Sequence, residues 1–157
     1  MKINLKLLIK SIALPLAVGG IAAFFTNDAM KEFQVLTQPP LSPPAWLFPV
    51  VWTILYILMG ISAYLIETSD ASLNAKTNAI LLYNYQLIVN FLWPIFFFNF
   101  GWYLFSFFWL LLLWILVFLM IRSFSRISKT AAYLNIPYLV WLTFAAYLNA
   151  GIWWLNR

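Results

Sequence analysis

Aromatic rings and side-chain amides are the groups in this chain that could do chemistry, and they recur at helical spacing in three apolar segments. Residues three or four positions apart lie on one face of a helix. The three sets are Phe48, Trp52 and Tyr56; Gln86, Asn90 and Trp93; and Tyr138, Trp141, Ala145 and Leu148. Large rings beside a few hydrogen-bonding groups suit a flat apolar ligand that carries some polar atoms. These residues therefore form a candidate ligand site.

Groups for conventional catalysis are scarce. The chain has no Cys and no His, which excludes disulfides, thiolate nucleophiles, Ser-His pairs and zinc or haem sites that use those ligands. The acidic residues Asp28, Glu32, Glu67 and Asp70 all lie near segment ends or in loops. Acid/base hydrolysis therefore has almost no groups to use. We expect no metal site and no required cofactor.

The composition points to lipid as the main solvent. Hydrophobic residues make up 65% of the 157 residues and charged residues only 8%, whereas soluble domains carry about 25% charged residues. The net charge of +5 could suggest nucleic acid as a partner. However, the Lys and Arg residues flank apolar runs, which is the pattern of membrane orientation, so we expect no nucleic acid partner.

Five apolar runs must position the candidate site, at about 7–26, 45–66, 78–98, 101–121 and 132–154. A helix needs about 20 residues to cross a hydrocarbon core about 30 Å thick. Because lipid cannot satisfy backbone polar groups, continuous apolar runs favour helices over a β-barrel. The sequence predicts an all-α integral membrane protein, a five-transmembrane-helix bundle that forms a single domain over 1–157. The short connection at 99–101 predicts an antiparallel hairpin of the third and fourth spans.

The distribution of positive charge predicts the direction of the spans. Lys2, Lys6 and Lys10 precede or open the first span, and further positive charges lie in the loops after spans two and four. The positive-inside rule then places the N-terminus in the cytoplasm and the C-terminus outside, most simply in a bacterial inner membrane. A cleaved signal peptide over residues 1–25 is the alternative, although Pro15 interrupts its apolar region.

Depth in the membrane brings the aromatic and amide residues together. At 1.5 Å per residue, Trp52 lies about 10 Å, Asn90 about 12 Å and Trp141 about 20 Å from the outer ends of their spans. A pocket beneath the external loop 28–44 is therefore expected. In that loop, Met30, Phe33 and Leu36 could line a short helix that acts as a lid; a surface amphipathic turn is the alternative.

Structural roles are the alternative for each of these residues. Tryptophans near span ends are typical of an aromatic belt, and deeper ones can simply pack. Gln86 and Asn90 could join helices by hydrogen bonds. Gly19, Gly20 and Gly60 are most simply sites where helices approach closely, because small residues let backbones come together.

Three ordered motifs resemble one known family. The run Pro39 to Trp46, followed by Pro49 to Gly60, resembles the signature of the TspO/MBR translocator proteins, also called tryptophan-rich sensory proteins. The segment Gln86 to Trp93 resembles the family's third-helix motif, and Pro137 to Asn149 its fifth-helix motif. The resemblance covers nearly the whole chain.

This resemblance implies a five-helix bundle, usually a homodimer, with a ligand cavity that opens toward the first loop. It implies binding of porphyrins such as protoporphyrin IX and other hydrophobic ligands, and in some bacterial members light-dependent oxidative breakdown of the porphyrin. The two tryptophans tied to that reaction match Trp52 and Trp141, the cavity asparagine matches Asn90 and the pocket alanine matches Ala145. The resemblance also favours the third span as the dimer face.

The chain departs from the family pattern in its first loop. Glu32 and Phe33 stand where the family usually has a Trp-Tyr pair, Gln38 stands in place of a lysine, and Leu41 replaces an aromatic residue. A neutral Gln38 removes a possible ion pair with a porphyrin propionate. A cholesterol motif is also missing, because no basic residue follows Tyr147 closely.

The leading hypothesis is a membrane receptor for porphyrins of the protoporphyrin IX type and related hydrophobic ligands. Trp52 and Trp141 are the expected catalytic residues if photo-oxidation occurs. The expected ligand-binding residues are Phe33, Leu36, Pro43, Pro44, Phe48, Trp52, Tyr56, Gln86, Asn90, Trp93, Tyr138, Trp141, Ala145 and Leu148. A porphyrin or lipid carrier or sensor without catalysis is the main alternative. A lipid-binding regulator and a purely structural membrane subunit are the others.

Overall fold

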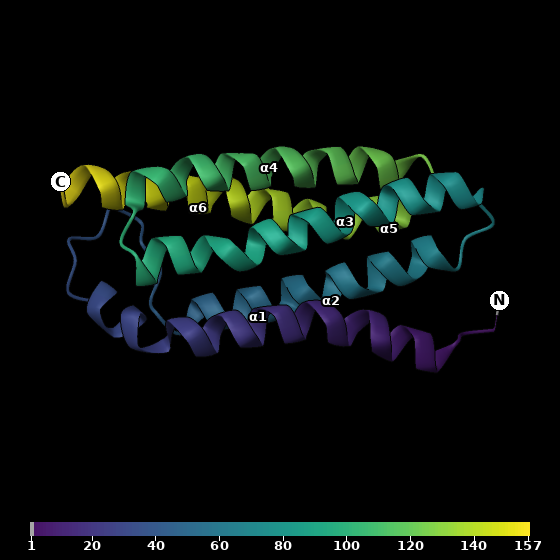
Figure 1. Cartoon of the computed structure of the whole chain (residues 1–157), viewed down its shortest axis with the longest axis horizontal. Coiled ribbons are helices and arrows are strands. Elements are labelled where there is room, and N and C mark those ends of the chain that lie inside the picture. Colours follow the sequence, from purple (N-terminus) through teal and green to yellow (C-terminus); the bar gives the residue numbers. More distant parts are fainter. Residues whose placement is uncertain (1) are drawn as a thin grey trace.

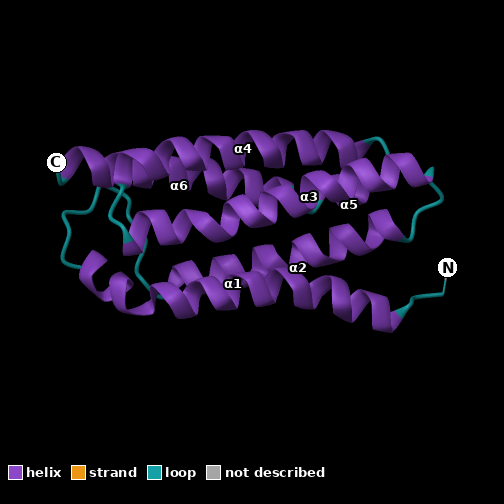
Figure 2. Ribbon diagram, in the orientation of Figure 1, coloured by secondary structure: helices purple, strands orange, loops and turns teal. Residues whose placement is uncertain are grey.

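A computed structural model of the chain describes residues 2–157, which fold into long helices laid side by side (Figure 1). The helices are α1 Leu5–Phe33, α2 Leu47–Glu67, α3 Leu73–Pro94, the π-helix η1 Ile95–Asn99, α4 Tyr103–Ser125, α5 Lys129–Tyr133 and α6 Ile136–Leu155. No strand occurs within this described part of the chain, as Figure 2 shows. The all-helical fold expected from the apolar runs is confirmed.

Five helical stretches are long and apolar enough to cross a membrane. They are Leu5–Phe33, Leu47–Glu67, Leu73–Asn99, Tyr103–Ser125 and Lys129–Leu155. Each overlaps one predicted span. The third stretch joins α3 to η1, and the fifth joins the short α5 to α6. The five-helix membrane bundle follows directly from these lengths, because 20 residues of helix span about 30 Å.

The first helix is longer than the sequence suggested. It runs to Phe33 instead of ending near residue 26, so residues 28–33 continue α1 and do not form a separate short helix. The Thr26 hydroxyl donates to the Ala22 carbonyl (2.9 Å), so this polar residue adds no break. The next proline after Pro15 is Pro39, so no proline interrupts the chain between the middle of α1 and the loop that follows it.

Helix packing places the spans in a ring. Helix α1 packs along α2, α4 packs along both α3 and α6, and α1 also meets α3 and η1. Gly60 faces the backbone of α1 at Ile12, and Gly19 faces the ring of Tyr56. A Cβ at either glycine would collide with these atoms, which confirms both as sites of close helix approach.

The third and fourth spans form an antiparallel hairpin, as expected (Figure 1). The connection turns at Gly101, whose φ of +64° lies in the left-handed region that glycine adopts without strain. The Trp109 indole on α4 donates to the Val89 carbonyl on α3 (2.8 Å), which fixes the two helices against each other. The N- and C-termini lie at opposite ends of the bundle (Figure 1).

Candidate functional site

The centre of the bundle holds a buried polar cluster made of Tyr56, Gln86, Asn90 and Tyr138. Tyr56 donates its hydroxyl proton to Asn90 Oδ1 (2.9 Å), and Asn90 Nδ2 donates to the Tyr138 hydroxyl (2.7 Å). That hydroxyl in turn donates to Gln86 Oε1 (2.7 Å). The cluster joins α2, α3 and α6, so the three faces identified from the sequence do meet. It is hydrogen-bonded internally, as buried polar groups in lipid must be.

Aromatic rings surround this polar cluster on one side. Trp52 stacks on Tyr56, with ring centroids 5.5 Å apart, and meets Tyr138 edge-on at 6.1 Å. Trp141 meets Phe48 edge-on at 5.9 Å and Phe144 at 5.6 Å. Stacked and edge-to-face pairs at these distances are favourable. Trp52 and Trp141 therefore each belong to a small group of packed aromatic rings contributed by α2 and α6.

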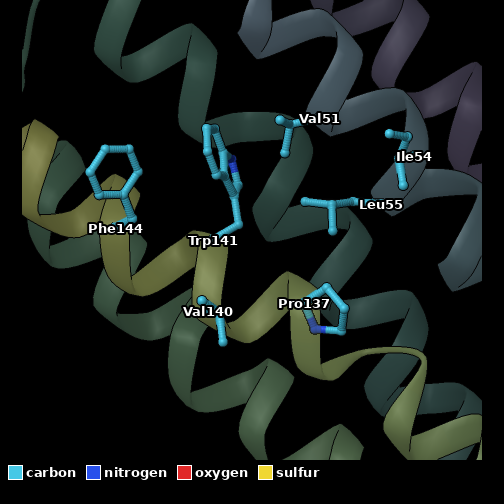
Figure 3. Close-up of a pocket in the computed structure, with 7 residues that line it drawn as sticks. All are labelled: Val51, Ile54, Leu55, Pro137, Val140, Trp141 and Phe144. Atoms are coloured by element: carbon cyan, nitrogen blue, oxygen red, sulfur yellow. The ribbon is translucent and has the colours of Figure 1, made fainter. Parts of the chain in front are cut away.

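A hollow of about 540 Å³ lies between α2 and α6, which we call the α2–α6 groove (Figure 3). Its lining is Val51, Ile54, Leu55, Pro137, Val140, Trp141 and Phe144. Ile54 and Val140 are 53% and 63% exposed on the outside of the bundle, so the groove opens sideways toward lipid. The polar cluster fills the space where α2, α3 and α6 face one another, which is where the sequence predicted the pocket. The hollow lies beside this cluster.

Only Trp141 among the expected ligand-binding residues lines this groove. Two of the three lining residues of α2, Val51 and Leu55, precede Trp52 and Tyr56 by one position, which is about 100° around a helix. Ala145 and Leu148 are half-buried on α6. The sequence missed the aliphatic lining residues because Val, Ile and Leu are common everywhere in a membrane span; their spacing at 51, 54 and 55 was the one available signal.

Trp93 and Phe33 belong to a different aromatic cluster. Trp93 donates its indole N–H to Asn149 Oδ1 (3.1 Å) and stacks on Phe97 at 5.0 Å. Phe33, at the end of α1, packs on Phe97 at 5.5 Å and on Phe98 at 5.2 Å. These residues join α1, η1 and α6, and none of them lines the α2–α6 groove.

The segment 34–46, here called the strap, is fastened to the end of α6. Thr37 N–H donates to Asn156 Oδ1 (3.0 Å), and Asn156 Nδ2 donates back to the Thr37 carbonyl (2.9 Å). The Tyr147 hydroxyl donates to the Pro40 carbonyl (2.7 Å), and Pro39 is buried against Gly151. These contacts could not be predicted from the sequence, because they join residues more than 100 positions apart.

The remaining expected residues lie in or beside the strap and outside the α2–α6 groove. Leu36 and Pro43 are half-buried and Pro44 is exposed. A second hollow of about 410 Å³ lies at this end, lined by Pro39, Pro40, Tyr147, Ala150, Gly151, Trp153, Trp154 and Leu155. The strap therefore covers one end of the bundle, while the larger groove opens along its side.

Five membrane-length helices around a hydrogen-bonded polar centre, with an aromatic groove on the flank, define a multi-pass α-helical membrane protein with the features of a small-molecule site. Comparison with known proteins agrees with this class. The chain belongs to the TspO/MBR family, whose model matches residues 11–155.

Similar proteins occur in bacteria and animals. The chain is 39% identical over 146 residues to the "Tryptophan-rich protein TspO" of Chlorobaculum tepidum, covering 92% of each chain. It is 33% identical to the "Protein CrtK" of Rhodobacter capsulatus over 88% of this chain and 85% of that one. It is also 33% identical to the "Translocator protein" of Homo sapiens, over 83% of this chain and 78% of the human protein. The family expected from the three motifs is thereby confirmed.

Proposed function

We propose that this protein is a membrane receptor for porphyrins of the protoporphyrin IX type and related hydrophobic ligands. The observation that carries the proposal is the α2–α6 groove, which joins a hollow of about 540 Å³ to an aromatic wall. Ligand sites commonly measure about 300–1,000 Å³ and are lined mainly by apolar and aromatic groups. Membership of the TspO/MBR family supports the same proposal through the resemblance stated above.

The groove suggests how such a ligand binds. A flat ring system would enter from the bilayer and stack on Trp141 and Phe144, the two aromatic residues of the groove lining (Figure 3). Stacking is worth about 0.5–1.5 kcal/mol per aromatic pair beyond the burial itself. Charged propionates would stay near the membrane surface, because an unpaired charge is costly in lipid. A metal-free porphyrin needs no axial ligand, so the chain's lack of His is compatible with it.

Light-dependent oxidative breakdown of the bound porphyrin is the finer part of the proposal. The porphyrin absorbs the light, dioxygen is the oxidant, and Trp52 and Trp141 are the oxidisable groups nearest the ligand. Trp141 lines the groove, whereas Trp52 is not a lining residue and packs against Tyr56. The double variant Trp52→Phe, Trp141→Phe should keep part of the binding and lose the light-driven decay of the Soret band. Decay at the wild-type rate would refute this role.

A carrier or sensor without catalysis is the second candidate, and one observation favours it. The hydroxyls of Tyr56 and Tyr138 donate to the amide oxygens of Asn90 and Gln86, which are not bases. No carboxylate or imidazole hydrogen-bonds this cluster among residues 2–157. The polar cluster therefore lacks the carboxylate or imidazole that most often serves as general acid or base, and a binding protein needs neither.

One titration separates the candidates. Purified protein is titrated with protoporphyrin IX, first in the dark and then under illumination, and the products are identified by mass spectrometry. Saturable binding in the dark supports the receptor, and new oxidised products in light support the photochemistry. Saturable binding without oxidised products would support a carrier or sensor that has no catalytic activity. Absence of saturable binding would refute the porphyrin receptor.

We also propose which membrane holds the protein, how its termini are oriented and how many chains associate. The start of α1, the connection between α2 and α3 and the basic loop 122–129 lie toward one end of the bundle (Figure 1). Lys6, Lys10 and Lys76 lie in the first two turns of α1 and α3, and this distribution of charge supports a cytoplasmic N-terminus in a bacterial inner membrane. The family resemblance supports a homodimer. Light scattering of the protein in detergent would test this, and a mass of one chain of 18.3 kDa at all concentrations would contradict it.

A further inference from the structure

The outer face of α4 carries an apolar stripe that ends in two arginines. Exposed residues of this helix recur at three- and four-residue spacing, which places them on one face. They include Phe108, Leu112, Ile115 and Leu119, followed by Arg122 and Arg126. Arg126 is the C-cap residue and keeps helical dihedral angles (φ −76°, ψ −18°), so both arginines continue the same face. We call this face the α4 stripe.

Neither arginine of the α4 stripe has an acidic partner. Among residues 2–157 the only ion pair joins Lys31 to Asp28, at the end of α1 that precedes the strap. The segment 122–130 adds Lys129 to the two arginines and contains no Asp or Glu. Guanidinium groups stay charged at any physiological pH. Two such groups one helical turn apart are therefore available to an anion from outside the chain.

Arg122 lies at the level where α4 leaves the hydrocarbon core. It is 19 positions after Tyr103, the first residue of α4, which is about 28 Å along the helix and close to the thickness of that core. The stripe residues from Leu112 to Leu119 fall within the last 15 Å or so before Arg122, the depth of one leaflet. No charged residue occurs between Lys76 and Arg122, so the other end of the stripe has no basic group on α4.

We infer that the α4 stripe binds an anionic phospholipid, with its phosphate on Arg122 and Arg126 and an acyl chain along Ile115 and Leu119. The planar guanidinium donates two parallel hydrogen bonds to phosphate oxygens, which a lysine cannot do. A zwitterionic headgroup brings its own cation beside the phosphate, so two unpaired arginines favour a headgroup with net negative charge. None of these residues lines the α2–α6 groove, so this inference is independent of porphyrin binding.

The test compares two lipids that share acyl chains and differ in headgroup charge. The purified protein is titrated with dioleoylphosphatidylglycerol and with dioleoylphosphatidylcholine, and bound lipid is counted by native mass spectrometry. The wild-type protein is compared with the double variants R122Q/R126Q and K6Q/K10Q. Lys6 and Lys10 are the matched control, because they are also exposed, one helical turn apart and toward the same end of the bundle (Figure 1).

We expect the wild-type protein to bind phosphatidylglycerol about tenfold or more tightly than phosphatidylcholine, the order that two basic residues near an anionic headgroup provide. R122Q/R126Q should lose most of this preference, and K6Q/K10Q should keep it. Equal losses in the two variants would show general attraction by the basic end of the bundle and would overturn the site. Equal binding of the two lipids by the wild-type protein would also overturn it.

A second copy of the chain is the other occupant that could cover the stripe. Because the chain has no cysteine, Ile115→Cys places a single exposed thiol on the stripe. Oxidation of membranes that contain this variant should leave the chain monomeric on a non-reducing gel, since lipid separates the thiols of neighbouring copies. A disulfide-linked dimer would show that protein covers the stripe and would overturn the inference.

Discussion

At the scale of single residues, the amide of Asn90 holds the bundle together from its centre. Its oxygen accepts from Tyr56 on α2 and its nitrogen donates to Tyr138 on α6, so one side chain on α3 links three spans. Because both the amide oxygen and the amide nitrogen of Asn90 are hydrogen-bonded to protein, few hydrogen-bonding positions remain for a ligand. Asn90 therefore positions Tyr56 and Tyr138, and the Trp52 ring packs against both tyrosines.

Asn90→Leu should destabilise the fold by about 1–2 kcal/mol, because it leaves the Tyr56 hydroxyl buried without an acceptor. Unfolding of the detergent-solubilised protein by a denaturing detergent, followed by circular dichroism, measures the free-energy change. Asn78→Leu is the control, since Asn78 is exposed near the start of α3. Equal stability of the two variants would contradict a structural role for Asn90.

At the scale of helices, the contact between α1 and α2 depends on Gly60. A Cβ there would meet the backbone of α1 at Ser11 and Ile12, which cannot move aside as a side chain could. Gly20 lies on α1 at an exposed position, and a Cβ added to it would meet nothing within 4 Å, so the expectation of close helix approach at Gly20 is wrong. The two glycines therefore make a matched pair for mutagenesis.

Gly60→Ala should cost about 1–3 kcal/mol through overpacking, while Gly20→Ala should be neutral or slightly stabilising through helix propensity. The same detergent unfolding assay compares both variants with the wild-type protein. If Gly60→Ala were as stable as Gly20→Ala, then α1 would not be held by close packing at this position.

The strap 34–46 is an element whose closure depends on very few bonds. Asn156 exchanges two hydrogen bonds with Thr37, and Tyr147 adds one to Pro40. Most of the other strap residues are exposed, so the strap is the part of the chain most easily opened. The separate lid helix expected around Met30, Phe33 and Leu36 does not form, because Met30 and Phe33 belong to α1. The strap is the remaining candidate lid, and it covers the end of the bundle and not the groove.

Asn156→Ala should raise the rate of proteolysis within the strap about fivefold or more, because it removes both bonds to Thr37. Limited proteolysis with mass spectrometry of the fragments measures the rate, and Asn74→Ala at the opposite end of the bundle serves as control. Adding porphyrin to the wild-type protein tests the lid directly. Cleavage unaffected by the ligand would favour a surface turn with no gating role.

At the scale of the whole molecule, the sequence predicts more of the helices than of the site. Five apolar runs are sufficient to predict five spans, and helical spacing correctly groups Tyr56, Asn90 and Tyr138 around one centre. The groove could not be predicted in this way, because its position depends on how far apart α2 and α6 are held by their neighbours. The strap contacts were equally hidden, since Thr37 and Asn156 meet only after the whole bundle has formed.

The orientation of the molecule decides from which side the strap is reached, and the chain's lack of cysteine makes it measurable. Single variants Val35→Cys in the strap and Asp70→Cys between α2 and α3 place one thiol at each end of the bundle, both at exposed positions. With the N-terminus in the cytoplasm, a membrane-impermeant maleimide should label Val35→Cys in intact bacterial cells and Asp70→Cys only after lysis. The reverse pattern would place the strap in the cytoplasm. Labelling of both thiols in intact cells would mean that Asp70 is not on the cytoplasmic side, and the charge-based orientation would then be wrong.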